Sequence, residues 1–170
     1  MAVPNQQIDE KTCFTLVGQF LRDWALMEMQ LNDVIGAALE LNGAQKFIVC
    51  SNIQFRDKIH IARTAVDIAT ARDKAEHYKS ELVKLGKFTT ERNMVAHDVF
   101  GVSDDRDGVI FLVTQAKGRL KFPEIVWTKR DFEKRQQKMD AFTQMLVGLV
   151  ADMKQHAQTV PLAKALASPT

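Results

Sequence analysis

Val109–Trp127 reads VIFLVTQAKGRLKFPEIVW, and this stretch decides the fold. Its two outer parts, residues 109–115 and 120–127, are rich in β-branched and aromatic side chains, and the turn-like residues 116–119 lie between them. The pattern predicts a β-hairpin. Because Pro123 has no amide hydrogen to donate, the second strand is expected at a sheet edge or at a bulge.

The sequence on both sides of the hairpin has helical periodicity. Apolar residues recur at spacings of three and four, and these runs predict helices over residues 11–42, 51–70, 73–97 and 128–156. The third of these is expected either to continue past Gly86, with a kink, or to end there and restart at Thr89 and Thr90. The apolar segment 44–50 fits either the start of the next helix or a buried link. The chain is therefore expected to contain four or five helices.

Turn-forming and capping residues predict where these helices begin and end. Gly43 is expected as the left-handed residue beyond the first helix. Ser51 and Gln54 match the capping box, in which two side chains satisfy the free backbone donors of a helix start. Thr128 is expected to be the N-cap of the last helix.

Together these elements predict a mainly α fold, a four- to five-helix up-and-down bundle with a small β-hairpin (about 109–127) inserted before the last helix. Residues 1–157 are expected to form a single domain, and residues 158–170 a flexible C-terminal tail. Residues 101–108 are expected to form a loop. Its aspartates lack the spacing and the distal glutamate of an EF-hand, so calcium is not expected there.

Composition sets limits on the class of protein. Hydrophobic residues make up 46% and charged residues 26% of the 170 residues, which is typical of a soluble globular domain. No apolar run approaches the roughly 20 residues that span a bilayer, so no membrane association is expected. No signal peptide is recognised in residues 1–10, and Cys13 and Cys50 have no metal-ligand spacing. Cytoplasmic location, two free thiols, no metal and no cofactor are expected.

The segment ERNMVAHD, Glu91–Asp98, carries the most chemistry. Asn93 and His97 are four residues apart and share a helix face, and the long side chain of Arg92 can reach the same place from about 140° round the helix. Arginine binds phosphate, and histidine moves protons near neutral pH. The same spacing recurs at Arg72 and His77, where helix capping by Asp73 is an ordinary explanation.

Arg92–His97, RNMVAH, resembles the RxxxxH motif of HEPN domains, in the variant with a polar residue after the arginine. The small helical setting, with the motif late in the bundle and one helix after it, is also similar. The resemblance implies a metal-independent endoribonuclease that acts as a homodimer on single-stranded RNA, with catalytic Arg92, Asn93 and His97 lining a cleft between subunits. It also implies a role in toxin–antitoxin systems, phage defence or RNA processing, with an antitoxin or another protein as partner.

One branch of that family has a tyrosine two residues after the histidine, where a nucleotidyltransferase antitoxin modifies it. This chain has Val99 at that position, so regulation by that route is not expected. Ribonuclease activity remains an expectation of the resemblance.

Other residues allow competing interpretations. Lys84 and Lys87 precede the motif and are expected either to contact RNA phosphates or to form a solvated face. Glu28 is a candidate supporting residue behind the site. Alternatively, Arg92 forms a structural ion pair with Glu28 or Asp33. The chain would then be a non-catalytic helical interaction module, or a protein that binds phosphate or a nucleotide without cleaving it.

Overall fold

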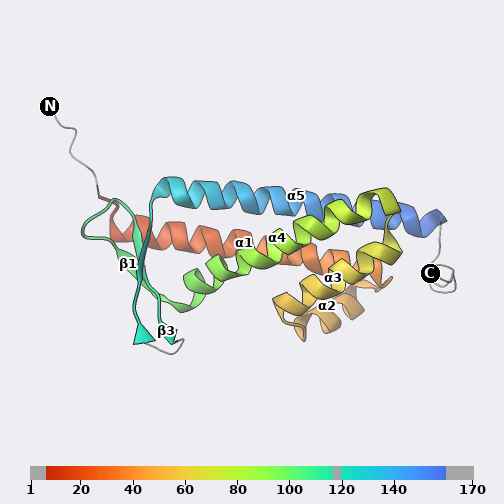
Figure 1. The fold of residues 1–170 in the computed structure, drawn as a ribbon, viewed down its shortest axis with the longest axis horizontal. Helices are drawn as coiled ribbons and strands as arrows, with labels where there is room; N and C mark the ends of the chain where they lie inside the picture. Colours follow the sequence, from red (N-terminus) through yellow and green to blue (C-terminus); the bar gives the residue numbers. More distant parts are fainter. Residues whose placement is uncertain (1–6, 117–119, 160–170) are drawn as a thin grey trace. The chain divides into compact units, whose positions relative to one another are not determined.

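The computed structural model describes residues 7–116 and 120–159, and Figure 1 shows the fold. The helices of this part are α1 (Glu10–Ala38), α2 (Gly43–Ser51), α3 (Phe55–Ala69), α4 (Arg72–His97) and α5 (Lys129–Thr159). The strands are β1 (Val99–Val102), β2 (Val109–Leu112), β3 (Gln115–Ala116), β4 (Leu120–Lys121) and β5 (Glu124–Trp127). The mainly helical class and the small sheet before the last helix are thus confirmed.

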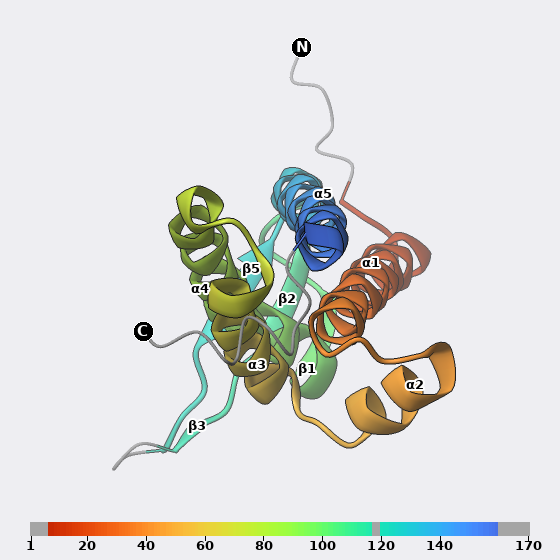
Figure 2. The same ribbon diagram turned by 90° about the vertical axis from the view of Figure 1, so that its right-hand side faces the viewer.

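The chain folds into two compact units, and α1, α4 and α5 each contribute to both. The first unit combines the chain up to Ala25 with residues 88–139, and the second combines residues 26–87 with the chain from Asp140 onwards. In the second unit, α2 and α3 both contact the second half of α1 (Figure 2). The expected C-terminal tail lies almost wholly outside the described residues.

A three-stranded antiparallel sheet, in the order β1-β2-β5, belongs to the first unit. Val109 of β2 is aligned with Val102 on one side and with Trp127 on the other. The pairing of β2 with β5, and of β3 with β4, confirms the expected hairpin. β5 pairs on one side only, so the edge position expected from Pro123 is also confirmed.

The third strand, β1, overturns part of the sequence-based expectation. Gly101 was expected in a loop, but it lies inside β1 and is aligned with Ile110. The strand VFGV is short and contains a glycine, which strand propensity disfavours. Its backbone finds partners only once β2 is in place, so tertiary pairing determines this element and local sequence does not.

The inner face of the sheet packs on an aromatic core. Phe111 lies 5.1 Å, centroid to centroid, from Trp127, and Trp127 lies 5.7 Å from Phe20 of α1. Phe20 in turn lies 6.2 Å from Phe88 of α4. Each of these four residues is at least 96% buried. These contacts stabilise the first unit because they bury apolar surface and because aromatic rings at such distances attract each other.

The second unit has a helical core, and its helix ends differ from those expected. The left-handed residue after α1 is Glu40, with φ 53°, whereas Gly43 is the first residue of α2. The capping box is formed by Asn42 and Gln45 at the start of α2. Ser51 ends α2, and its hydroxyl donates to the carbonyl of Phe47. The predicted Ser51 capping box is therefore wrong, because residues 44–50 form a helix of their own.

The cap of the last helix is confirmed. The Thr128 hydroxyl oxygen accepts from the amide of Asp131 at 3.3 Å, and the Thr128 amide donates to the Asp131 carboxylate at 3.0 Å. The hydroxyl and amide of Thr128 lower the pKa of the Asp131 carboxyl. This reciprocal arrangement starts α5 directly after β5.

Candidate functional site

The predicted catalytic residues lie on the last turns of α4, within the first unit. α4 runs through Gly86 to His97 as one helix, so it does not end at Gly86 and restart. Val95 is 98% buried and holds this end of the helix to the core. Asn93 and His97 are exposed, and Arg92 is half-buried. The segment thus presents its polar side chains at the surface.

The structure brings these three side chains together. One terminal nitrogen of Arg92, Nη1, donates to Oδ1 of Asn93 at 3.2 Å. The same nitrogen lies 3.3 Å from Nε2 of His97. A guanidinium group has only donors, so this contact is a hydrogen bond when Nε2 of His97 accepts and the ring proton is on Nδ1. The Arg92 side chain therefore lies along the helix surface and contacts both Asn93 and His97.

A second set of contacts anchors α4 on its other flank. The carboxylate of Glu91 lies 2.6 Å from Nε of Arg135 and 3.9 Å from Nζ of Lys138, both on α5. The guanidinium of Arg135 also stacks on Trp127, with 3.7 Å from its carbon to the ring centroid. Glu91 thus forms ion pairs with α5, and among the described residues no ion pair joins it to Arg92.

The arrangement has the parts of a phosphate site with proton transfer. A planar guanidinium recognises two oxygens of a phosphate with parallel hydrogen bonds. An accepting imidazole nitrogen next to it can take a proton from a hydroxyl group. The amide of Asn93 orients the guanidinium through its oxygen and keeps its two amide hydrogens for another acceptor.

The remaining predicted residues belong to the second unit and have contacts of their own. Glu28 accepts from Lys58 at 2.7 Å, and Asp33 is ion-paired with Lys46. The two acids offered as structural partners of Arg92 thus have lysine partners. Lys84 pairs with Glu81 at 2.6 Å, and Lys87 is exposed. The ion pair with Glu81 supports the solvated-face interpretation for Lys84. The exposure of Lys87 allows this side chain to contact a phosphate.

The second occurrence of the Arg-to-His spacing has different geometry. Arg72 and His77 are both exposed, and within the described residues no hydrogen bond joins them. α4 begins at Arg72, so Asp73 lies in the first turn and the predicted N-cap position is two residues too late. Only the pair Arg92 and His97 is brought into contact.

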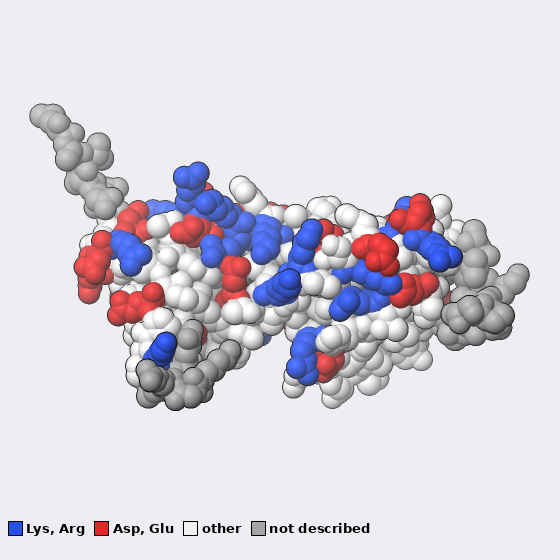
Figure 3. Space-filling model, viewed as in Figure 1, with Lys and Arg blue, Asp and Glu red and all other residues white. Residues whose placement is uncertain are grey.

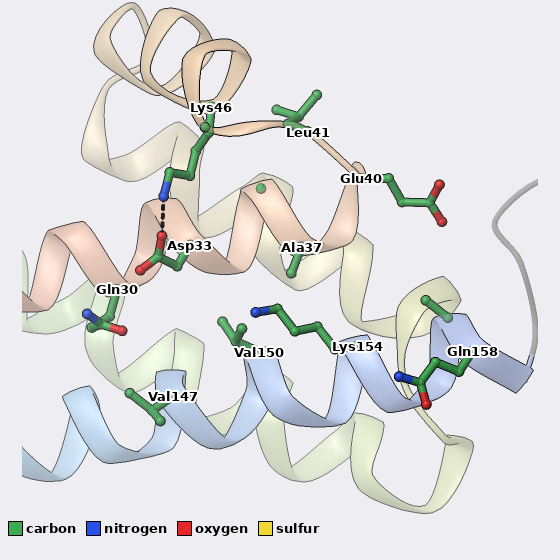
Figure 4. Close-up of a pocket in the computed structure, with 13 residues that line it drawn as sticks. Gln30, Asp33, Ala37, Glu40, Leu41, Lys46, Val147, Val150, Lys154 and Gln158 are labelled. Atoms are coloured by element: carbon green, nitrogen blue, oxygen red, sulfur yellow. Dashed lines mark hydrogen bonds and ion pairs between the residues drawn. The ribbon is translucent and has the colours of Figure 1, made fainter.

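A separate cavity of about 800 Å³ lies in the second unit, between α1, the start of α2 and the second half of α5 (Figure 4). Its lining includes the Lys46–Asp33 ion pair, and Lys154 reaches into the opening from α5. None of the predicted catalytic or RNA-binding residues lines it. Its mixed apolar and charged lining does not define a reaction.

Comparisons with known proteins give no match: no family model, no curated protein and no solved structure matches this chain. Within the described residues, no three His, Cys, Asp or Glu side chains cluster in a way that could hold a metal ion. None of the described helices combines the length and the apolarity that crossing a bilayer requires. The site has therefore to be interpreted from its own geometry.

The sequence alone did not single out the basic residues in the first half of α5. Arg130, Lys134 and Lys138 recur every four residues, which is the spacing of one helix face. That periodicity was the available signal. Phe132 and Met139 lie on a different face of the same helix and belong to the core.

Proposed function

We propose that this chain is a HEPN-like, metal-independent endoribonuclease that cleaves single-stranded RNA with Arg92, Asn93 and His97. The observation that carries the proposal is the position of Nη1 of Arg92, 3.2 Å from Asn93 and 3.3 Å from Nε2 of His97. These are the three residues that define the resemblance. Lys84 and Lys87 remain candidates for additional phosphate contacts.

The chemistry follows from these groups. The RNA's own 2′-oxygen attacks the adjacent phosphorus, and the bond from phosphorus to the 5′-oxygen breaks. Nε2 of His97 takes the 2′-proton, and the guanidinium of Arg92 shifts onto the phosphate oxygens, where negative charge develops. The products are a 2′,3′-cyclic phosphate and a 5′-hydroxyl end.

This reaction also needs a proton for the leaving 5′-oxygen, and one imidazole cannot hold and accept a proton at the same moment. A second copy of the chain supplies the missing acid through its own His97. The site is then complete only in a homodimer, in which one histidine is the base and the other is the acid.

An apolar patch next to the site supports this subunit contact. Val99, two residues after His97, is 69% exposed. Its partner in register on β2, Leu112, is 41% exposed on the same outward face of the sheet. A second copy that covers this patch removes apolar area from water and brings two His97 side chains towards each other.

The decisive experiment incubates purified protein with a 5′-labelled single-stranded RNA in the presence of EDTA and maps the new ends. We expect cleavage that leaves cyclic phosphates, and its loss in His97→Ala and in Arg92→Ala. Arg72→Ala and His77→Ala are matched controls, because they remove the same residue types from exposed positions on the same helix. Circular dichroism verifies that all four variants keep their helicity.

Equal cleavage by the wild type and the His97→Ala/Arg92→Ala double variant would end the proposal. A stable dimer that is inert towards RNA would favour the alternative of an interaction module. Thermal stabilisation by nucleotides without cleavage would favour the alternative of a phosphate-binding protein.

A further inference from the structure

The first half of α5 carries a concentration of positive charge. Between residues 129 and 139 there are five basic side chains and two acidic ones. The basic ones are Lys129, Arg130, Lys134, Arg135 and Lys138. Figure 3 shows lysine and arginine side chains gathered along this part of the helix.

Four of these side chains share one face. At about 100° per residue, Arg130, Lys134, Lys138 and Arg135 fall within an arc of roughly 140°, and the buried Phe132 lies outside it. We call these four residues the basic face of α5. Asp131 falls in the same arc, but its carboxylate is bonded to Thr128 and serves the helix cap. Lys129 and Glu133 lie outside the arc.

Two side chains of the basic face contact neighbouring residues, and two do not form ion pairs within the described part of the chain. Arg135 stacks on Trp127 and pairs with Glu91, and Nζ of Lys138 lies 4.3 Å from the ring centroid of Phe88. Arg130 and Lys134 are exposed, and neither has an ion-pair partner among the described residues. Their charges are therefore available to a ligand.

Arg135 connects the basic face to the candidate catalytic residues. Glu91, which contacts Arg135, directly precedes Arg92 in α4. The two helices run in opposite directions here, and α4 diverges from α5 towards its His97 end (Figure 1). The contact of Arg135 with Glu91, one residue before Arg92, is therefore the link between the basic face and the candidate catalytic residues.

We propose that the basic face of α5 binds the sugar–phosphate backbone of the RNA strand and leads it to Arg92 and His97. Cations four residues apart stand about 6 Å apart along a helix, which provides a series of charges for successive phosphates. No large apolar side chain is exposed between residues 129 and 139, whereas a helix that binds a membrane surface needs one. This inference rests on the proposed function, because only that function makes Arg92 and His97 the place to which the RNA strand leads.

Binding and cleavage are measured separately. Binding is followed by fluorescence anisotropy with a labelled single-stranded RNA at several salt concentrations, in a His97→Ala background that leaves the RNA intact. Arg130→Gln/Lys134→Gln should weaken binding by about 10-fold and reduce the slope of log K against log salt by about 1.4, because each lost phosphate contact removes about 0.7. Glutamine keeps the helix and removes only the charge.

Lys129→Gln/Lys154→Gln is the matched control, since both residues are exposed on α5, both lie outside the basic face, and the net charge changes equally. It should bind within about 2-fold of the parent. An unchanged slope in Arg130→Gln/Lys134→Gln, or an equal loss in the control, would overturn the inference. Binding to phosphatidylserine vesicles that needs Arg130 and Lys134, without RNA binding, would overturn it in favour of a membrane surface.

Cleavage assays distinguish this inference from the proposed function. With active protein, Arg130→Gln/Lys134→Gln should raise KM about 10-fold and leave kcat unchanged, whereas His97→Ala removes kcat. Wild-type cleavage with an unchanged KM in Arg130→Gln/Lys134→Gln would overturn the inference and leave the proposed function intact. RNA binding that depends on the basic face, in a protein that does not cleave, would support the inference and end the proposed function.

Discussion

Nη1 of Arg92 lies 3.3 Å from Nε2 of His97, although the two residues are five positions apart in α4. Their side chains leave the helix about 140° apart, so only a long side chain lying along the surface can close the gap. The contact with Asn93 holds the guanidinium in this direction. The site thus depends on the length and the planar donors of arginine, beyond its charge.

Arg92→Lys tests this dependence. Lysine keeps the positive charge but offers a compact ammonium in place of the planar fork, so it cannot bridge Asn93 and His97 in the same way. We expect kcat for RNA cleavage to fall by roughly 10- to 100-fold with little change in RNA affinity. Cleavage by Arg92→Lys at the wild-type rate would show that charge alone is sufficient.

Val99→Asp tests the subunit contact. A carboxylate at a position that a second copy covers would have to be desolvated, so the dimer should dissociate. We expect light scattering to report the monomer mass for this variant, and cleavage to fall with it. Ile48→Asp is the control, because Ile48 is 67% exposed on α2, close to the 69% of Val99. A Val99→Asp protein of unchanged mass and activity would contradict the proposed contact.

Periodicity and capping chemistry predicted most of the fold. The long helices, the hairpin and the Thr128 cap depend on interactions between residues close in the sequence, which a local pattern can reveal. β1 was missed because its partner strand begins seven residues later and its own propensity is weak. The Ser51 cap was wrong because Ser51 ends a separate helix, α2, which Asn42 caps, and α3 begins only at Phe55.

The candidate site was predictable as a set of residues but only partly as an arrangement. Helix geometry places Asn93 beside His97, and the resemblance names Arg92. Neither helix geometry nor the resemblance reveals that Glu91 pairs with Arg135 of α5, which follows more than 40 residues later in the chain. The basic face of α5 likewise gains its connection to the site only through that tertiary contact.

Gly108→Ala tests the packing of the sheet that follows the site. A β-carbon at Gly108 would lie 2.5 Å from the carbonyl oxygen of Trp127, and backbone atoms cannot move aside cheaply. We expect this substitution to lower the free energy of unfolding by about 1–3 kcal/mol, measured by denaturant titration. In Gly101→Ala the new methyl group meets nothing within 4 Å, so stability should be unchanged or slightly higher.

Tyr78 provides a pH-dependent test of the second unit. Its hydroxyl donates to the Asp152 carboxylate at 2.6 Å, and Lys74 donates to the other oxygen at 2.8 Å. Burial, and then the hydrogen bond to Asp152, raise the pKa of Tyr78 from 10.0 to about 12. Tyr78 is the single tyrosine of the chain, so the phenolate absorbance reports on it alone.

Between pH 10 and about 12 the unfolded chain loses the Tyr78 proton while the folded protein keeps it. The folded state then binds more protons, so the free energy of unfolding must fall as the pH rises through this window. We expect the denaturation midpoint to fall less steeply there in Tyr78→Phe than in the wild type. Asp152→Asn removes the negative charge, and the absorbance titration of Tyr78 should then move to lower pH. A titration near pH 10 in the folded wild type would show that the hydrogen bond and the burial do not control this group.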